Sequence, residues 1–241
     1  MRGTATVVAE LAGDGRTVIR VAAGSPQLVP RVTGPGEVHL AATAGGPLGG
    51  DDLCMDIRVG PGASLNVRTI AASIALPGTG EPSRLAVSAR IGDGACLRWL
   101  PEPTVAAAGC DHLTSTDVAL AAGARLVLRE ELIAGRHGET SGVLRSSVRV
   151  ERAGEPVFAQ TLTLGDRSSP PGVPSRAVGS LFVVGQPGNE GPARVLGPWA
   201  VVMPLACAGA VLVSVLADDA HPLRTLLDAE LASAAALHIG D

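Results

Sequence analysis

A short glycine-centred segment recurs three times in the first half of the chain, and it constrains the fold more than any other feature. The three copies read VGPGASL, IGDGACL and LAAGARL and centre on Gly62, Gly94 and Gly123, at a spacing of about 30 residues. Each copy ends an apolar run, turns at a glycine, which tolerates positive φ, and begins another apolar run. This spacing predicts stacked β-turn-β units that bury one another's faces; the alternative is three unrelated turns in a glycine-rich chain.

Alternating apolar and polar residues predict β-strands along most of the chain. The clearest runs, separated by glycine or proline clusters, span residues 4–11, 17–22, 37–43, 53–59, 65–69, 143–150 and 157–164. Two longer segments rich in proline and glycine, 168–174 and 185–198, are predicted loops. The expected fold class is therefore all-β.

An uncharged apolar run over residues 195–217 is long enough to cross a bilayer as a helix. Pro204 and the valine-rich end of the run instead favour two buried strands with a turn between them. We therefore expect no membrane segment here.

The end of the chain predicts a helix. Asp218 and Asp219 give a helix-start signal, and leucines at three- and four-residue spacing then predict one amphipathic helix over 219–238. With no linker in sight, we expect a single domain over 1–241, in which this helix packs on a β-body over about 1–217.

The composition excludes several classes of function. All 19 basic residues are arginine, so the chain has no lysine for a Walker A phosphate loop or a Schiff base. Aromatic residues make up 2% of the chain and the net charge is −4, which disfavours nucleic-acid binding. Hydrophobic residues make up 46%, enough for a sizeable core of Val, Leu, Ile and Ala.

The cysteines and the first residues favour a cytoplasmic protein. Cys54, Cys96, Cys110 and Cys207 form no C-x-x-C pair, and we expect reduced thiols that pack as small apolar side chains. The first residues lack the long apolar core of a signal peptide.

Few local motifs carry chemistry. Cys110, Asp111 and His112 form the sharpest cluster, and all three side chains are able to bind a divalent metal such as nickel or zinc. The alternative is a surface loop with an incidental cysteine, because two or three local ligands seldom suffice without partners elsewhere. Asp51 follows a flexible Gly-Gly turn, which predicts a buried carboxylate whose hydrogen-bond partners are Arg136 or ordered water. Taken alone, Arg136 and Glu139 make a surface pair of little energetic weight.

Several weak motifs occur in an order typical of one protein family. They are GGPLGGDDL at 45–53, GASL at 62–65, LPEPTV at 100–105, EELIAGR at 130–136, RVERAGEP at 149–156 and, near the end, LADD at 216–219 followed by LRTLL at 223–227. Together they resemble the UreD (UreH) family of urease accessory proteins over roughly residues 4–232. The chain departs from the family pattern at Asp52, where arginine is usual, and at 71–75, which holds neither lysine nor tyrosine.

The resemblance implies an all-β, stacked β-helix-like or β-sandwich-like body with a short C-terminal helical segment. It also implies a non-enzymatic scaffold, or chaperone, required for nickel insertion into apo-urease. The implied partners are a UreF-type protein, a UreG-type GTPase and apo-urease, with no nucleic acid or membrane. No tightly bound cofactor is implied, only transient Ni²⁺. By the same resemblance, Asp51, Glu131, Arg136 and Glu139 lie on the nickel path or at a partner surface.

Two other functions compete with this interpretation. A small hydrolase would need a histidine positioned by a carboxylate, and no motif in the sequence supplies one. A β-sandwich binding module unrelated to urease is the structural alternative, and the absence of paired cysteines disfavours an extracellular one.

Overall fold

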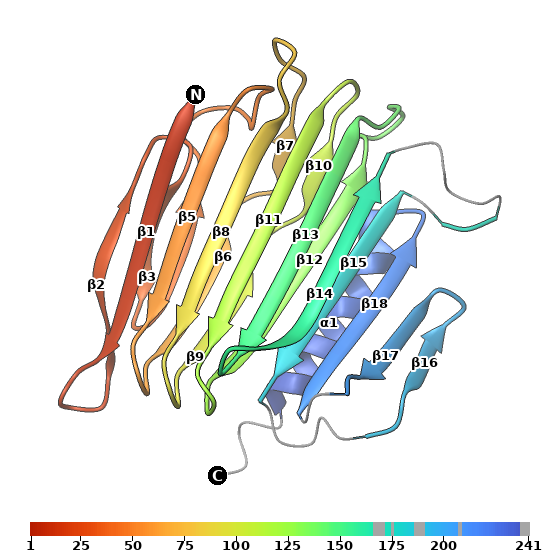
Figure 1. Ribbon diagram of the computed structural model, residues 1–241. Helices are drawn as coiled ribbons and strands as arrows, with labels where there is room; N and C mark the ends of the chain where they lie inside the picture. The colour runs from red at the N-terminus through yellow and green to blue at the C-terminus, as the bar shows by residue number, and fades with distance from the viewer. Residues whose placement is uncertain (166–171, 175, 186–190, 207–208, 237–241) are drawn as a thin grey trace.

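In the part of the chain that the structure describes, two β-sheets lie face to face and one helix packs against the outer side of the second sheet (Figure 1). The computed structural model describes residues 1–165, 172–174, 176–185, 191–206 and 209–236. The predicted all-β class is confirmed. No helix in the described residues is long and apolar enough to cross a membrane.

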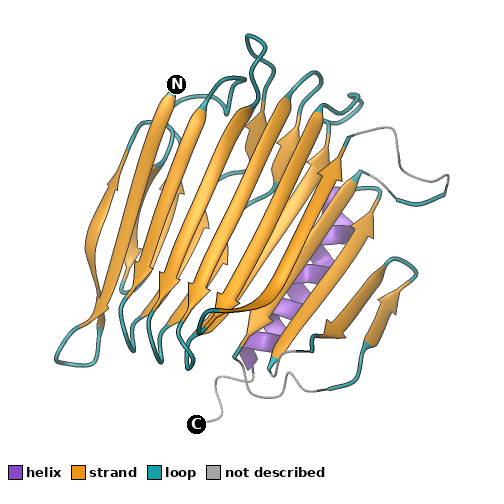
Figure 2. Cartoon of the chain, in the orientation of Figure 1, coloured by secondary structure: helices purple, strands orange, loops and turns teal. Residues whose placement is uncertain are grey.

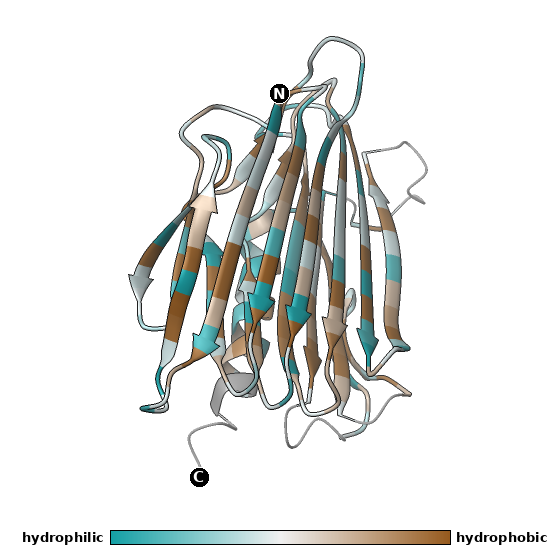
Figure 3. Cartoon of the chain, turned by 60° about the vertical axis from the view of Figure 1, so that its left-hand side comes forward, coloured by the Kyte–Doolittle hydropathy of each residue, from teal (hydrophilic) through white to brown (hydrophobic). Residues whose placement is uncertain are grey.

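The first sheet has seven strands, along which polar and apolar bands alternate (Figure 3). In order across the sheet they are β14 (Glu155–Leu164), β13 (Val143–Arg152), β11 (Asp111–Leu120), β8 (Ser83–Ile91), β5 (Asp52–Val59), β1 (Arg2–Leu11) and β2 (Thr17–Gly24). The strands from β13 to β1 pair in parallel, and the antiparallel strands β14 and β2 close the two edges.

The second sheet has eleven strands. Nine form its main path, in the order β16 (Arg194–Gly197), β17 (Ala200–Pro204), β18 (Ala210–Ala217), β15 (Ala177–Val184), β12 (Arg125–Ala134), β9 (Cys96–Leu100), β6 (Ser64–Thr69), β4 (Glu37–Ala41) and β3 (Val29–Gly34). The short strand β10 (Thr104–Ala106) pairs with β12, and β7 (Ser73–Ala75) pairs with β10. From β4 to β12 the main path is parallel.

The three glycine-centred segments occupy equivalent turns, as predicted. Each carries the chain from the first sheet to the second, at β5–β6, β8–β9 and β11–β12. The alanine after each glycine donates its N–H to the carbonyl three residues before it, at 3.1 Å in all three turns. Gly62 and Gly94 have φ values of 69° and 66°, but Gly123 does not adopt positive φ. The expected need for glycine is therefore confirmed at two turns and wrong at the third.

Stacking of these turns aligns one leucine from each coil in a ladder through the core. Leu65 is in register with Leu97, and Leu97 with Leu126. None of the three is more than 2% exposed, and all belong to the core between the sheets. Burial of each stabilises the fold by about 1.5–3 kcal/mol before entropic costs. The prediction of stacked units with a shared core is confirmed.

The C-terminal strands correct two sequence predictions. The run over 195–217 is not a helix, and its break at Pro204 is confirmed, but it contributes to three strands rather than two. It is also not fully buried, since Val195 on the edge strand β16 is 81% exposed. Because β16 lies within the predicted loop 185–198, that loop is shorter than expected. Most of the predicted loop 168–174 lies outside the described residues.

The predicted helix is α1 (Ala220–Ala236), shown in purple in Figure 2. Its start is capped by Asp219, whose carboxylate accepts the N–H of His221 at 3.0 Å. Leu223, Leu227 and Leu231 are buried against β15 and β18. The end of the predicted span lies outside the described residues.

Three of the four cysteines can be placed. Cys96 and Cys110 are buried and Cys54 is exposed, and all three are free thiols. Packing as small apolar side chains is thus confirmed for two of them; Cys207 lies outside the described residues.

Candidate functional site

Asp51 lies in a tight turn immediately before β5. Its N–H donates to the Leu48 carbonyl at 2.9 Å, and Gly50 supports the turn with a φ of 85°. The Asp51 carboxylate is buried, accepts the Leu48 N–H at 2.9 Å and pairs with the amino group of Met1. Burial raises the pKa of Asp51, but these hydrogen bonds outweigh it and hold the pKa below its ordinary value. Asp51 is the buried acid that the glycines predicted, but Arg136 is not its partner.

A cavity of about 50 Å³ adjoins Asp51, and we call it the upper cavity. His112 lines it from the first sheet, and its Nδ1 lies 2.8 Å from Ser83 Oγ. Both side chains are almost fully buried. Burial lowers the pKa of His112 to about 4, so the imidazole is neutral at physiological pH.

A second cavity of about 80 Å³, the central cavity, lies between the two sheets. Both cavities are lined by four of the same residues, Leu28, Ser73, Leu85 and Thr104, so they adjoin. The central cavity is lined by hydroxyls and carboxylates as well as by apolar side chains. The space between the sheets is therefore polar along part of its length.

Glu130 is one of three glutamates that line the central cavity, with Glu102 and Glu131. Ser146 Oγ donates to Glu130 Oε1, and Thr114 Oγ1 donates to Ser146 Oγ at 3.0 Å. Burial raises the pKa of Glu130, and the Ser146 hydrogen bond only partly opposes that rise. Glu130 consequently takes up a proton at a higher pH than an exposed glutamate.

A break in the second sheet adjoins the central cavity. β9 pairs with residues 125–128 of β12, and β10 pairs with residues 132–134, so residues 129–131 have no strand partner on that side. The chain between β9 and β10 contains Pro101 and Pro103, which have no N–H to donate to a ladder. The prolines thus explain why the ladder stops.

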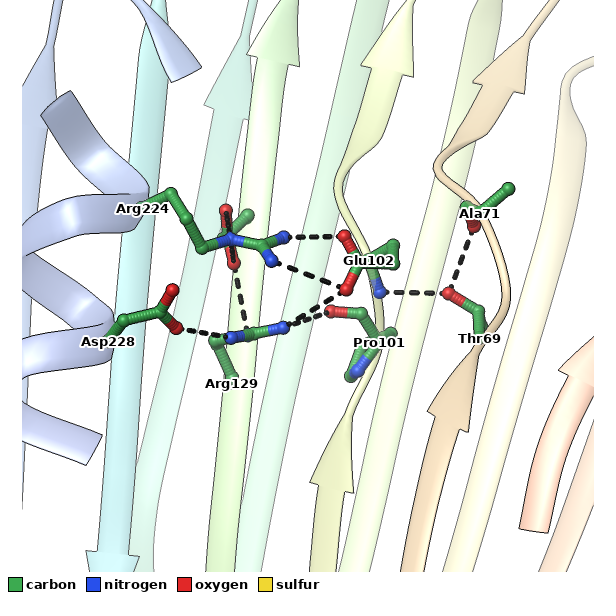
Figure 4. Close-up of polar contacts among 8 residues, drawn as sticks. Thr69, Ala71, Pro101, Glu102, Arg129, Arg224 and Asp228 are labelled. Atoms are coloured by element: carbon green, nitrogen blue, oxygen red, sulfur yellow. Dashed lines mark hydrogen bonds and ion pairs between the residues drawn. The ribbon is translucent and has the colours of Figure 1, made fainter. Parts of the chain in front are cut away.

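Five charged side chains meet at this break, and we call them the charge network: Glu102, Arg129, Glu131, Arg224 and Asp228 (Figure 4). Arg224 of α1 reaches Glu102 at 2.9 Å and Glu131 at 2.8 Å. Arg129 contacts Asp228 of α1 and Glu131, both at 3.0 Å, although its approach to Glu131 lacks hydrogen-bond alignment. The network joins α1 to the strand that carries Glu130 on its other face.

Burial and ion pairing have opposite effects on the pKa values of the charge network. Burial raises the pKa of Glu131, and the two arginines only partly restore it. Burial also lowers the pKa of Arg129, although three carboxylates surround it. Removing one partner from such a buried group is costly because the remaining charge loses its counter-ion.

The other predicted site residues lie apart from these cavities. Arg136 and Glu139 pair with each other at 2.7 Å in an exposed turn after β12, and the hydrogen bonds from Arg136 lower the pKa of Glu139 to about 2. Of the four residues carried over by resemblance, only Asp51 lines the upper cavity and only Glu131 lines the central one. Their roles in nickel transfer stay predictions.

Cys110, Asp111 and His112 do not converge. Cys110 Sγ faces the carbonyl of Val143 at 3.9 Å, while Asp111 pairs with Arg145 at 2.7 Å. Within the described residues no group of three or more His, Cys, Asp or Glu side chains is arranged to hold a metal. The metal site predicted from these three residues therefore finds no support in this geometry.

Sequence reasoning missed most of the charge network and assigned no role to Glu130. The available signal was the run Arg129-Glu130-Glu131 in the middle of an otherwise apolar strand. Three consecutive charges there require buried partners on both faces of the sheet.

The fold and site define an all-β protein of stacked coils whose two sheets enclose polar and charged side chains. The chain belongs to the UreD family of urease accessory proteins, since the model of that family matches residues 1–240. This confirms the resemblance drawn from the motifs and gives the protein a role in urease maturation.

Individual relatives agree with this assignment. The chain is 44% identical over 261 residues to the urease accessory protein UreD of Parafrankia sp. (strain EAN1pec), covering 95% of this chain and 87% of that protein. It is 43% identical over 252 residues to UreD of Streptomyces coelicolor, covering 97% and 96%. For UreD 1 of Saccharopolyspora erythraea the identity is 38%, with 95% and 94% covered. These names describe accessory proteins rather than enzymes.

Proposed function

We propose that this protein is a cytoplasmic scaffold, or chaperone, required for insertion of nickel into apo-urease, and that it acts with UreF-type and UreG-type partners. Membership of the UreD family supports the link to urease. The observation that supports the nickel role is the pair of adjoining, partly polar cavities, which extend from Asp51 to the charge network.

The chemistry along these cavities suits a cation that must pass rather than stay. Nickel accepts oxygen and nitrogen ligands, and transfer needs binding strong enough to enter and weak enough to leave. The lowered pKa of Asp51 keeps it anionic at one end, where an entering cation would take the place of the Met1 amino group that pairs with it. The raised pKa of Glu130 makes it a weaker ligand in the middle, since proton and metal compete for the same oxygens.

The neutral imidazole of His112 adds a nitrogen donor to the wall of the upper cavity. Its Nδ1 is engaged with Ser83, so Nε2 is the atom left for a ligand. A hydrolase would use a histidine differently, with a carboxylate to orient it; among the described residues the ring's hydrogen-bond partner is a serine. The geometry thus favours passage over hydrolysis.

Substitution of Asp51 tests the proposal. Wild type and Asp51→Ala are expressed in a urease-positive host whose own copy of the gene is deleted, and urease is purified for nickel content and activity. We expect wild type to restore both, and Asp51→Ala to lower nickel per urease while accessory partners still co-purify. Asp51→Asn, which keeps the shape of the side chain, checks that loss of charge is responsible.

The adjacent Asp52 offers a matched control, because it is exposed on β5 and outside both cavities. Asp52→Ala should leave nickel loading unchanged. Full nickel loading with soluble Asp51→Ala would show that this carboxylate is not on the metal's path. Failure of the wild-type gene to restore urease would contradict the proposed function itself.

A further inference from the structure

The outer face of the second sheet carries a basic surface that the cavities and the charge network do not use. Arg68 on β6 and Arg98 on β9 alternate with core-facing neighbours, so both point outward. Asn66 is the register partner of Arg98, which makes the two arginines diagonal neighbours. His39 on β4 is in register with Arg68, and Arg31 on β3 with His39. We call these four residues the arginine surface.

The two central arginines lack the counter-ions that the chain supplies elsewhere. Among the described residues no carboxylate forms an ion pair or hydrogen bond with Arg68 or Arg98, whereas Arg129 on the same sheet contacts three. At the edge of the arginine surface, Glu37 lies 3.7 Å from His39. Burial lowers the pKa of Arg98; the nearby Cys96 opposes this in part, and the positive charge of Arg68 adds a smaller lowering.

Such an arrangement is unfavourable in the isolated chain. Two like charges on adjacent strands repel, and partial burial deprives Arg98 of water that would screen the repulsion. A carboxylate placed between them removes the repulsion and accepts paired hydrogen bonds from the guanidinium groups. The surface is therefore incomplete until an anionic group covers it.

The surroundings of the arginine surface indicate what kind of anion fits. Ile70 follows β6 directly, two residues after Arg68, and its large apolar side chain is 62% exposed. Among the described residues, the main contacts of α1 are with β15 and β18 rather than with the strands that carry the arginine surface. An apolar anchor next to arginine is typical of protein interfaces. A phosphate or nucleic acid gains nothing from Ile70, and the net charge of −4 disfavours a polyanion.

We propose that the arginine surface is the docking site for an acidic segment of a partner protein, which places carboxylates between Arg68 and Arg98 and an apolar side chain on Ile70. The inference rests on the proposed function only in taking that partner to be a component of urease maturation.

The direct test uses the full-length protein and a fluorescent peptide of glutamates around one leucine. Charge reversal at both positions, R68E/R98E, should weaken peptide binding about a hundred-fold, since each interface arginine typically contributes a factor near ten. R84E is the matched control, because Arg84 is an exposed arginine on the first sheet, and it should bind as wild type does. If R68E/R98E does not fold, R68Q/R98Q takes its place in the binding measurement. Because R68Q/R98Q removes the repulsion between the two arginines, its melting temperature should be no lower than that of wild type.

Three results would overturn the inference. One is equal peptide affinity of wild type and R68Q/R98Q. Another is displacement of the peptide by inorganic phosphate beyond the effect of sodium chloride at matched ionic strength, which would assign the arginine surface to phosphate. The third is measured in cells in which wild type restores urease. There we expect R68E/R98E to fail, and full restoration by a folded R68E/R98E would refute a docking role. If wild type itself fails there, the proposed function fails, while the peptide measurement still decides the inference.

Discussion

Protonation of His112 should destabilise the fold over a defined pH window. The ring is 1% exposed and neutral, and burial lowers its pKa from 6.5 to about 4. Between pH 6.5 and about 4 the imidazole is therefore protonated in the unfolded chain but neutral in the folded chain. The stabilisation is fully present above pH 6.5 and is lost as the pH falls toward 4. Linkage gives a loss of about 2 kcal/mol by pH 5 and about 3 kcal/mol by pH 4.

Other groups titrate in the same pH window, so the effect of His112 is measured as the difference in the free energy of unfolding between wild type and a variant without the imidazole. His112→Asn keeps an acceptor for Ser83 where Nδ1 now lies, but it cannot take up a proton. Urea unfolding of wild type and variant at pH 7.5, 5 and 4 gives the difference between their free energies of unfolding at each pH. We expect that difference to shift by about 3 kcal/mol in favour of the variant between the highest and lowest pH.

A constant difference across the three pH values would refute the reasoning, because it would mean that the folded and unfolded chains protonate alike. A shift in favour of wild type as the pH falls would also contradict it, since that is the direction expected when nearby acids stabilise the protonated ring.

Two further substitutions test the fold. Gly62→Val should lower the free energy of unfolding by about 1–3 kcal/mol through backbone strain at positive φ, and a variant as stable as wild type in urea titrations would contradict that strain. Arg224→Met leaves Glu131 with Arg129 as its remaining partner and should cost about 1–3 kcal/mol by the same assay, and a variant as stable as wild type would show that the network is energetically neutral.

The stacked coils were predictable because their signals are local. Glycine turns and strict alternation lie within single segments of sequence, and parallel register follows when equivalent turns stack. β12 gave no such alternation, since Leu126 and Leu128 face the core while Val127 faces α1 on the other side. A strand buried on both faces is indistinguishable by pattern from other apolar runs.

The candidate site was predictable only where a local cause exists. Asp51 follows from its glycine turn, which brings the carboxylate into a confined space. The charge network depends on pairs such as Glu131 and Arg224, which are 93 residues apart and meet only because α1 returns to the sheet. The expected contact of Asp51 with Arg136 failed for a simple reason: Glu139 is three residues away and satisfies Arg136 within its own turn.

The antiparallel strands at the ends of the first sheet determine how many coils the protein has. Each parallel strand pairs with the next through the same pattern of backbone donors and acceptors. The pairing itself therefore does not limit the number of coils in the stack. An extra coil inserted between β8 and β11 would lengthen the stack by about 4.8 Å and disturb neither end. Loss of the β13–β14 hairpin would instead leave β11 as an unpaired parallel edge, which favours pairing with another chain and aggregation.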